Sequence, residues 1–234
     1  MKHNRIKYKF NKDKIDIDNP IFCYFIGLVS TDGYISVKTK RVIIRIRNED
    51  SFRLLTKLKE YFEYEGPIFK YKDKDYELRL SSMYLIKYLE NLNITKDKTT
   101  TLPFISSFST EDCFRMYIRG LHDGDGNIKR RISKISNRWI GGEFRILNNN
   151  KQFIIDFCNW FNKKFYTNYI PKIAKRKYTD YLEFYSGVKK GKDFAKWFYQ
   201  GFDEIKLFCK YKKYLTVRDN DIVRTIENKK SIEL

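Results

Sequence analysis

Two short stretches of the sequence share one pattern, an apolar helix end that closes on an aspartate and a glycine. The first is FIGLVSTDG at residues 25–33, and the second is IRGLHDGDG at residues 118–126. Their final aspartates, Asp32 and Asp125, are 93 residues apart (125 − 32), a suitable length for a repeated half-domain. Carboxylate oxygens bind Mg²⁺, which proteins usually hold together with water and phosphate oxygens. If the two stretches meet in the fold, their acids predict a divalent metal site that faces a phosphate.

Each stretch also contains a glycine inside its helix. Gly27 and Gly120 each cost about 1 kcal/mol relative to alanine in a helix interior, and close approach of another helix is the usual compensation. We therefore expect the two helices to cross at these glycines, with Asp32 and Asp125 as neighbours. A solvated Asp-Gly turn is the simpler interpretation of either copy alone, but the repetition in one helix-to-strand context favours the metal site.

The two stretches resemble the paired motifs of the LAGLIDADG homing endonucleases, in the single-chain form that carries both motifs. The second stretch matches closely, whereas the first has Ser30 where the family usually has an acid. The acid directly before the last glycine matters for catalysis in the family, and it is present in both copies. The similarity extends from about residue 22 to about residue 215, because the order of the flanking elements also fits.

This resemblance implies intron homing by an endonuclease that makes a double-strand break with short 3′ overhangs in a long, asymmetric DNA target. It implies that Asp32 and Asp125 bind Mg²⁺, and that Mn²⁺ or Ca²⁺ can occupy the same site. The backbone carbonyls of Thr31 and Gly124 are the further ligands, and the metal assists attack of water on each strand. The family also places a lysine near each active centre. By position these are Lys98 and Lys212, with Lys96, Lys210 and Lys213 as alternatives.

The composition favours a nucleic acid as the partner. The 234-residue chain carries 48 Lys and Arg against 29 Asp and Glu, a net charge of +19, and such a basic balance is typical of proteins that bind double-stranded DNA. We expect no membrane partner and an intracellular protein, because the sequence shows no long apolar run and no secretion signal. Four scattered cysteines argue against a zinc ribbon or a disulfide framework. With two histidines, mechanisms that need several imidazoles are excluded.

Hydrophobic periodicity predicts an α+β fold in which one unit occurs twice. Each half reads as helix, two strands, helix, two strands, helix, or α-β-β-α-β-β-α. Asn19 and Pro20 predict the start of the first motif helix. We expect a pseudo-two-fold repeat with two antiparallel four-stranded sheets that form a DNA-binding saddle. The expected units are a basic arm at 1–18, a first half at 19–95, a linker at 96–109, a second half at 110–216 and a tail at 217–234.

Basic residues on the strands predict the surface that faces DNA. In residues 41–47 arginines share one face, and aliphatic residues occupy the alternate positions of the other. Arginine and lysine on strands can reach guanine O6 and N7 in the major groove, and other basic side chains neutralise phosphates. A solvated face is the simpler interpretation, but three arginines on one short strand favour DNA. The expected DNA-binding residues are Lys38, Arg41, Arg45, Arg47, Lys70, Lys72, Arg79, Lys129, Arg131, Arg145 and Lys172.

Three alternatives stay open from the sequence. Some members of the family are RNA-binding maturases that assist splicing, so intron RNA is an alternative partner. Loss of catalysis would leave a DNA-binding protein, and a centre weakened by Ser30 would make the protein a nickase. Retention of both Asp32 and Asp125 favours the endonuclease. We expect it to act as a monomer, because one chain carries both motifs.

Overall fold

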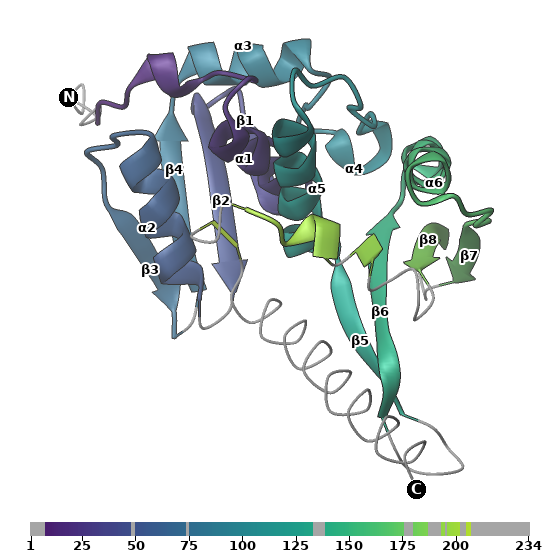
Figure 1. The fold of residues 1–234 in the computed structure, drawn as a ribbon. Helices are drawn as coiled ribbons and strands as arrows, with labels where there is room; N and C mark the ends of the chain where they lie inside the picture. The colour runs from purple at the N-terminus through teal and green to yellow at the C-terminus, as the bar shows by residue number, and fades with distance from the viewer. Residues whose placement is uncertain are drawn as a thin grey trace, which may run out of the picture.

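The computed structural model contains two units of one topology, joined by a pair of central helices (Figure 1). It describes residues 8–47, 50–73, 75–132, 139–175, 180–186, 193–194, 196–201 and 205–206. The elements of the first half are η1 (Lys12–Lys14), α1 (Pro20–Asp32), β1 (Gly33–Ser36), β2 (Arg41–Arg47), α2 (Ser51–Tyr61), β3 (Ile68–Lys72), β4 (Asp75–Ser81) and α3 (Met83–Asn91), and the short helix α4 (Lys98–Thr101) follows in the segment between the halves.

The second half repeats this order of helices and strands. Residues 193–194 and 196–198 are helical, at the place where the repeat predicts the last helix. The predicted α+β repeat is therefore confirmed. The elements of the second half are α5 (Glu111–Asp125), β5 (Asn127–Ile132), β6 (Trp139–Asn148), α6 (Lys151–Phe165), β7 (Lys172–Lys175) and β8 (Asp180–Ser186).

Each half contains one antiparallel four-stranded sheet. The strand orders are β1-β2-β4-β3 and β5-β6-β8-β7, so the second sheet reproduces the first strand for strand. In the first sheet Ile44 of β2 lies opposite Leu78 of β4, and both side chains are buried under the helices. Successive side chains of a strand point to opposite faces, so the arginines of β2 lie on the face away from the helices. The alternation predicted for residues 41–47 is confirmed.

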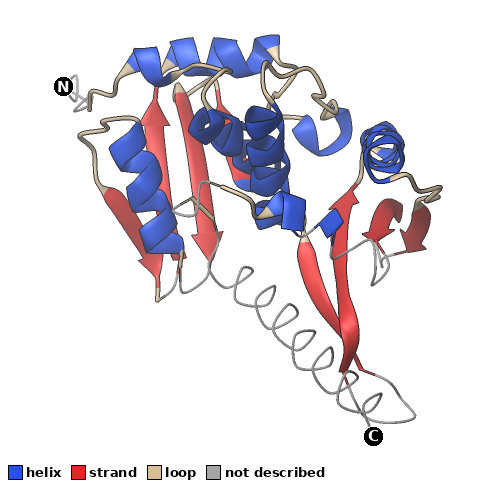
Figure 2. Cartoon of the chain, viewed as in Figure 1, coloured by secondary structure: helices blue, strands red, loops and turns tan. Residues whose placement is uncertain are grey.

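Helices α1 and α5 lie against each other, with the first sheet on one side and the strands of the second half on the other (Figures 1 and 2). Their backbones touch at the two glycines. A Cβ built on Gly27 would lie 2.8 Å from the backbone nitrogen of Leu121, and one built on Gly120 would lie 2.7 Å from that of Leu28. Any larger residue would therefore push the helices apart. No described helix is long and apolar enough to cross a membrane.

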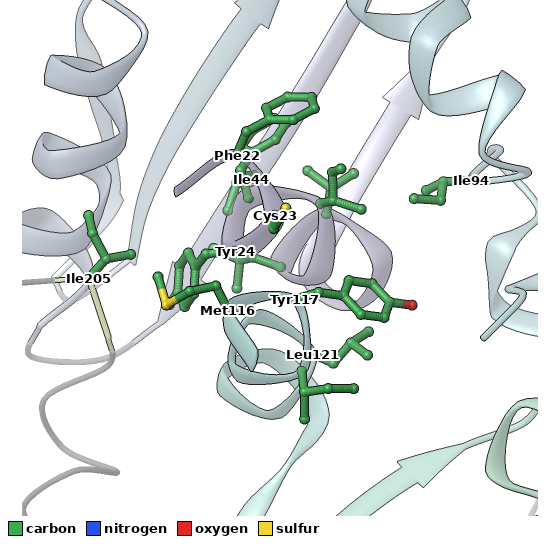
Figure 3. Close-up of a cluster of buried hydrophobic side chains, with 14 of the residues drawn as sticks. Phe22, Cys23, Tyr24, Ile44, Ile94, Met116, Tyr117, Leu121 and Ile205 are labelled. Carbon is green, nitrogen blue, oxygen red and sulfur yellow. The ribbon is translucent and has the colours of Figure 1, made fainter. Parts of the chain in front are cut away.

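Local sequence explains where the two helices start. The side chain of Asn19 accepts a hydrogen bond from the backbone N–H of Ile21, and Pro20 is the first helical residue of α1. Thr110 caps α5 in the same way by accepting from the N–H of Cys113. Apolar side chains then fill the space around the helix pair (Figure 3). Both helices thus start at caps that their own local sequence provides.

Candidate active site

Asp32 and Asp125 are the last residues of α1 and α5, at the same end of the helix pair. The residues that precede them are in contact, because a Cβ built on Gly124 would collide with the hydroxyl of Thr31. Each helix stops at the following glycine, where the backbone is extended and a strand begins. The helix crossing therefore brings together two carboxylates from the two halves.

Lys98 reaches the same place from the segment between the halves, where it begins the short helix α4. Its ammonium donates hydrogen bonds to the backbone carbonyls of Ser30 at 3.1 Å and Thr31 at 2.7 Å. Burial lowers the pKa of Lys98 below its usual value, while the charges of Asp125 and Asp32 act in the opposite direction. Both acids are thus close enough for their charges to act on the lysine.

The oxygen donors at this point suit a hard divalent cation. Two carboxylates meet there, and the adjoining carbonyls of Thr31 and Gly124 are further oxygen donors. The Thr31 carbonyl would share its lone pairs between Lys98 and a metal. Among the described residues, no group of three or more His, Cys, Asp and Glu side chains could hold a metal ion. A cation at the two acids would therefore also need water or phosphate oxygens, as Mg²⁺ usually does.

In α5 the residue three positions before the final glycine is an acid whose side chain contacts the other helix. Asp123 is buried and accepts a hydrogen bond of 2.7 Å from the Tyr24 hydroxyl of α1. Burial and then the charge of Asp123 raise the pKa of Tyr24 well above its usual value, so the hydroxyl keeps its proton. In the first motif Ser30 donates instead to the carbonyl of Ile26 in its own helix. The serine therefore alters a contact of the helix pair and leaves both final acids in place.

Arg119 is a functional candidate that was not predicted from the sequence. It is fully buried on α5, and its guanidinium donates to the carbonyls of Phe198 at 2.6 Å and Gly201 at 3.3 Å. Burial lowers the pKa of Arg119, and the charge of Asp123 opposes this shift. The arginine thus holds the segment that follows the last helical residues of the second half. The signal available in the sequence was a charged residue within an apolar motif, at the position where the first copy has Ile26.

The lysine of the second half has a candidate that was also missed. Lys206 is buried and comes eight residues after residue 198, the last helical residue that the structure describes. Lys98 comes seven residues after Asn91, the end of α3, so the two lysines occupy similar places in the repeat. Lys96, by contrast, is exposed. The predicted Lys212 and its alternatives Lys210 and Lys213 lie outside the described residues.

The face of the first sheet away from the helices carries most of the basic residues expected there. The arginines of β2 lie on it together with Arg79 of β4, and Lys38 is exposed in the turn between β1 and β2. On the second sheet Arg145 alternates with two buried residues of β6 and therefore lies on the corresponding face. The backbones of Lys129, Arg131 and Lys172 lie in β5 and β7, but their side chains, like that of Lys72, lie outside the described part of the chain.

Lys70 is an exception, and its predicted place on this face is wrong. It lies opposite Tyr76 in the register, and the ring of Tyr76 packs on Phe52 of α2 at 5.2 Å. Residues opposite each other share a face, so Lys70 lies on the helix side of β3. A register shift between residues 70 and 72 pairs Lys72 with Asp75 instead. The strand alternates normally up to this point, since the ring of Phe69 lies against Arg79 on the outer face, and the prediction placed that alternation on the wrong face.

Comparisons with known proteins bear on the fold. No family model matches the sequence, and no curated protein sequence matches it. The LAGLIDADG homing endonuclease I-SmaMI bound to cleaved DNA aligns with a TM-score of 0.57 at 13% identity, over 90% of this chain and 91% of that chain. I-LtrWI bound to target DNA aligns with a TM-score of 0.55 at 14% identity, over 90% and 92%. Mesophilic variants of I-DmoI align with a TM-score of 0.53 at 20% identity, over 80% and 98%.

The chain therefore has the fold of the LAGLIDADG homing endonucleases, with both motif helices in one polypeptide. The resemblance read from the two Asp-Gly stretches is confirmed at this level. The alignments cover nearly the whole length of the solved proteins, so both halves share the fold. One fold can carry several activities, and the activity has to come from the groups at the site.

Proposed function

We propose that the protein is a homing endonuclease that makes a metal-dependent double-strand break with 3′ overhangs in a long asymmetric DNA duplex. The observation that carries this proposal is the meeting of Asp32 and Asp125 at one end of the helix pair, with Lys98 beside them. Solved proteins of the same fold are described as homing endonucleases bound to DNA, including I-DmoI in complex with DNA and Ca. These descriptions support the proposal for this chain.

The acids would hold the divalent cations, with Mg²⁺ as the expected metal and Mn²⁺ or Ca²⁺ as substitutes. Asp32 and Asp125 would each serve one strand, helped by the carbonyls of Thr31 and Gly124. When bound, the cation stabilises the negative charge that develops on the scissile phosphate. Lys98 places a positive Nζ beside both acids and adds to this stabilisation. Its lowered pKa also makes Nζ a better proton donor than an exposed lysine.

The second half needs a lysine in the matching role. We propose Lys212, with Lys206 as the competing candidate because its spacing after the last helical residues resembles that of Lys98. Replacing each lysine by methionine separates the two. The catalytic lysine should be the one whose loss slows cutting of one strand while cutting of the other continues.

The two sheets would bind the duplex with their basic faces. The net charge of +19 and the arginines of the first sheet fit a partner with a regular array of phosphates. Neutralisation of several phosphates makes the binding constant fall steeply with salt. A monomer suffices for two cuts, because one chain supplies both acids.

Incubation with a library of duplex targets and Mg²⁺ tests the proposal. Cleavage should stop with EDTA, and D32N or D125N should lower double-strand cutting by a factor on the order of 10³ or more, since a bound metal contributes several kcal/mol. D13N removes an exposed carboxylate elsewhere and serves as the control. Cutting at the wild-type rate by either site variant would remove that acid from its role.

The maturase is the competing activity on the same scaffold. Binding of intron RNA and of duplex DNA can be compared at one salt concentration. A preference for RNA of tenfold or more, about 1.4 kcal/mol, together with no cleavage of any duplex in the library, would decide for the maturase.

A further inference from the structure

Three charged side chains form a connected group on the outer face of the first sheet, which we call the arginine cluster: Arg45, Glu77 and Arg79. Arg45 of β2 lies directly opposite Glu77 of β4, and Arg79 follows two positions along β4 on the same face. Arg45 donates to Glu77 Oε2 from Nε at 2.8 Å and from Nη2 at 2.5 Å. Arg79 donates from Nε to the other oxygen, Oε1. One carboxylate therefore holds two guanidinium groups.

Two aromatic rings of the edge strand β3 support the same guanidinium groups. The central carbon of the Arg45 guanidinium lies 4.3 Å from the centre of the Tyr71 ring, and that of Arg79 lies 4.2 Å from the centre of the Phe69 ring. Guanidinium groups stack on aromatic faces. Each arginine is thus held along one edge by the carboxylate and on one face by a ring, which restricts both its position and its orientation.

The exposure of the three side chains indicates what the arginine cluster presents. The side chain of Glu77 is 1% exposed, whereas those of Arg45 and Arg79 are 46% and 33% exposed. Burial raises the pKa of Glu77, but hydrogen bonds from Arg79 and Arg45 outweigh it and leave the pKa below its usual value. The buried carboxylate therefore stays charged at neutral pH and acts as a support beneath two partly exposed cations.

This arrangement suits recognition that depends on the direction in which each guanidinium group points. An arginine that only neutralises a phosphate gains nothing from a neighbouring carboxylate, because the carboxylate repels the phosphate. Base readout is different, since it needs the planar group to point along one line. Arg79 donates to Glu77 from Nε, so this contact leaves the Nη donors of Arg79 for another partner. Paired N–H donors of this kind match the two acceptors O6 and N7 of guanine in the major groove.

We propose that Arg45 and Arg79 read guanines in one half of the DNA target and that Glu77 is the residue that positions both. The inference rests on the proposed function and adds a base preference to it. Diagonal positions on neighbouring strands lie about 7–8 Å apart, so the long side chains of the two arginines can reach neighbouring base pairs. Both arginines lie on the first sheet, so this guanine preference is assigned to the half-site that the first sheet would bind.

A randomised duplex library, recovered by binding and by cleavage at fixed salt, tests this assignment. The wild type should enrich guanine at two neighbouring positions on one side of the cut, each by about tenfold or more. R45A should lose the preference at one position, and R79A should lose it at the other. E77Q should reduce both. R45K keeps the charge without the two-pronged donor, so it should lose the base preference but keep the salt dependence.

Two controls separate positioning from folding and from net charge. E65Q removes an exposed acid elsewhere in the first half and should leave the enriched bases as they are. The melting temperature of each variant is measured in parallel, and the base preference is compared only among molecules that bind. A structural role for Glu77 alone would lower the melting temperature without changing which bases are enriched.

The possible outcomes are distinct. Unchanged guanine enrichment in R45A, R79A and E77Q overturns the inference while the endonuclease stands. A uniform loss of affinity with the same enriched bases would mean phosphate contacts, and it also overturns the inference. Failure of the wild type to bind or cut any duplex contradicts the proposed function itself.

Discussion

The motif helices of the two halves meet at equivalent glycines, yet they differ in what they bury. In α1 the motif contains Ile26 and Ser30, and in α5 the matching positions are Arg119 and Asp123. The charged pair in α5 is almost completely buried, at 0% and 1% exposure. The first half therefore has an apolar motif helix, and the second buries an arginine and an acid at the same positions.

This difference distinguishes the roles of the two acid positions in the repeated motif. The final acid is present in both copies, which fits the metal-binding role proposed for it. The earlier acid is present in one copy, where it accepts a bond from Tyr24 and lies close to Arg119. In the first half the last carbonyls of α1 bind the catalytic candidate Lys98. In the second half Arg119 holds the backbone of the segment that leads to Lys206.

Converting the second motif into the first should destabilise the protein most. R119I leaves the carboxylate of Asp123 buried without its neighbouring charge, and loss of one partner of a buried pair costs about 3–5 kcal/mol. The double variant R119I/D123S recreates the pattern of the first motif and should recover part of that loss. Unfolding of the wild type, R119I, D123S and R119I/D123S in urea gives the four free energies of one double-mutant cycle. Additive losses would show that the two charges are not coupled.

Replacement of Lys98 should show how much the first centre depends on its lysine. K98M should lower cleavage by about 10²–10³-fold, the usual effect of removing a group that stabilises transition-state charge. Because burial lowers the pKa of Lys98, the ammonium is lost at a pH below its usual range, and cleavage should fall as pH rises through that value.

A pH–rate profile of K98R checks the same assignment. Arginine stays protonated throughout, so any cleavage that K98R retains should persist to higher pH than in the wild type. If the wild-type profile and the K98R profile fall together, the alkaline limb belongs to another group.

Removing a tyrosine hydroxyl from one helix or from the other should have the smallest effects on stability, and the two effects should differ. Tyr24 donates to Asp123 at 2.7 Å, whereas Tyr117 donates to the carbonyl of Pro103 at 3.5 Å. Y24F should lower the free energy of unfolding by about 1.5–3 kcal/mol, because its bond is to a charged group. Y117F should cost about 0.5 kcal/mol or less, because its bond is long and neutral. Equal losses would contradict the asymmetry described for the two motifs.

The features that could be predicted are those set by neighbours in the chain. Asn19 and Pro20 start a helix through a side-chain cap and a fixed φ angle, and both effects are local. The alternation of β2 likewise predicts its two faces. Lys70 shows the limit, because the face on which it lies depends on how β3 pairs with β4, where Lys70 lies opposite Tyr76. Arg119 and Lys206 were missed because their surroundings come from distant parts of the chain.

Local sequence sets where most helices and strands form, which face of β2 is apolar, and that an acid ends each of two equivalent helices. Only the tertiary structure decided that these acids meet, that Lys98 joins them, and that Glu77 holds two arginines in place. The physical reason is the range of the interactions. Caps and periodicity act within a few residues, whereas close packing of two helices at their glycines joins groups far apart in the chain.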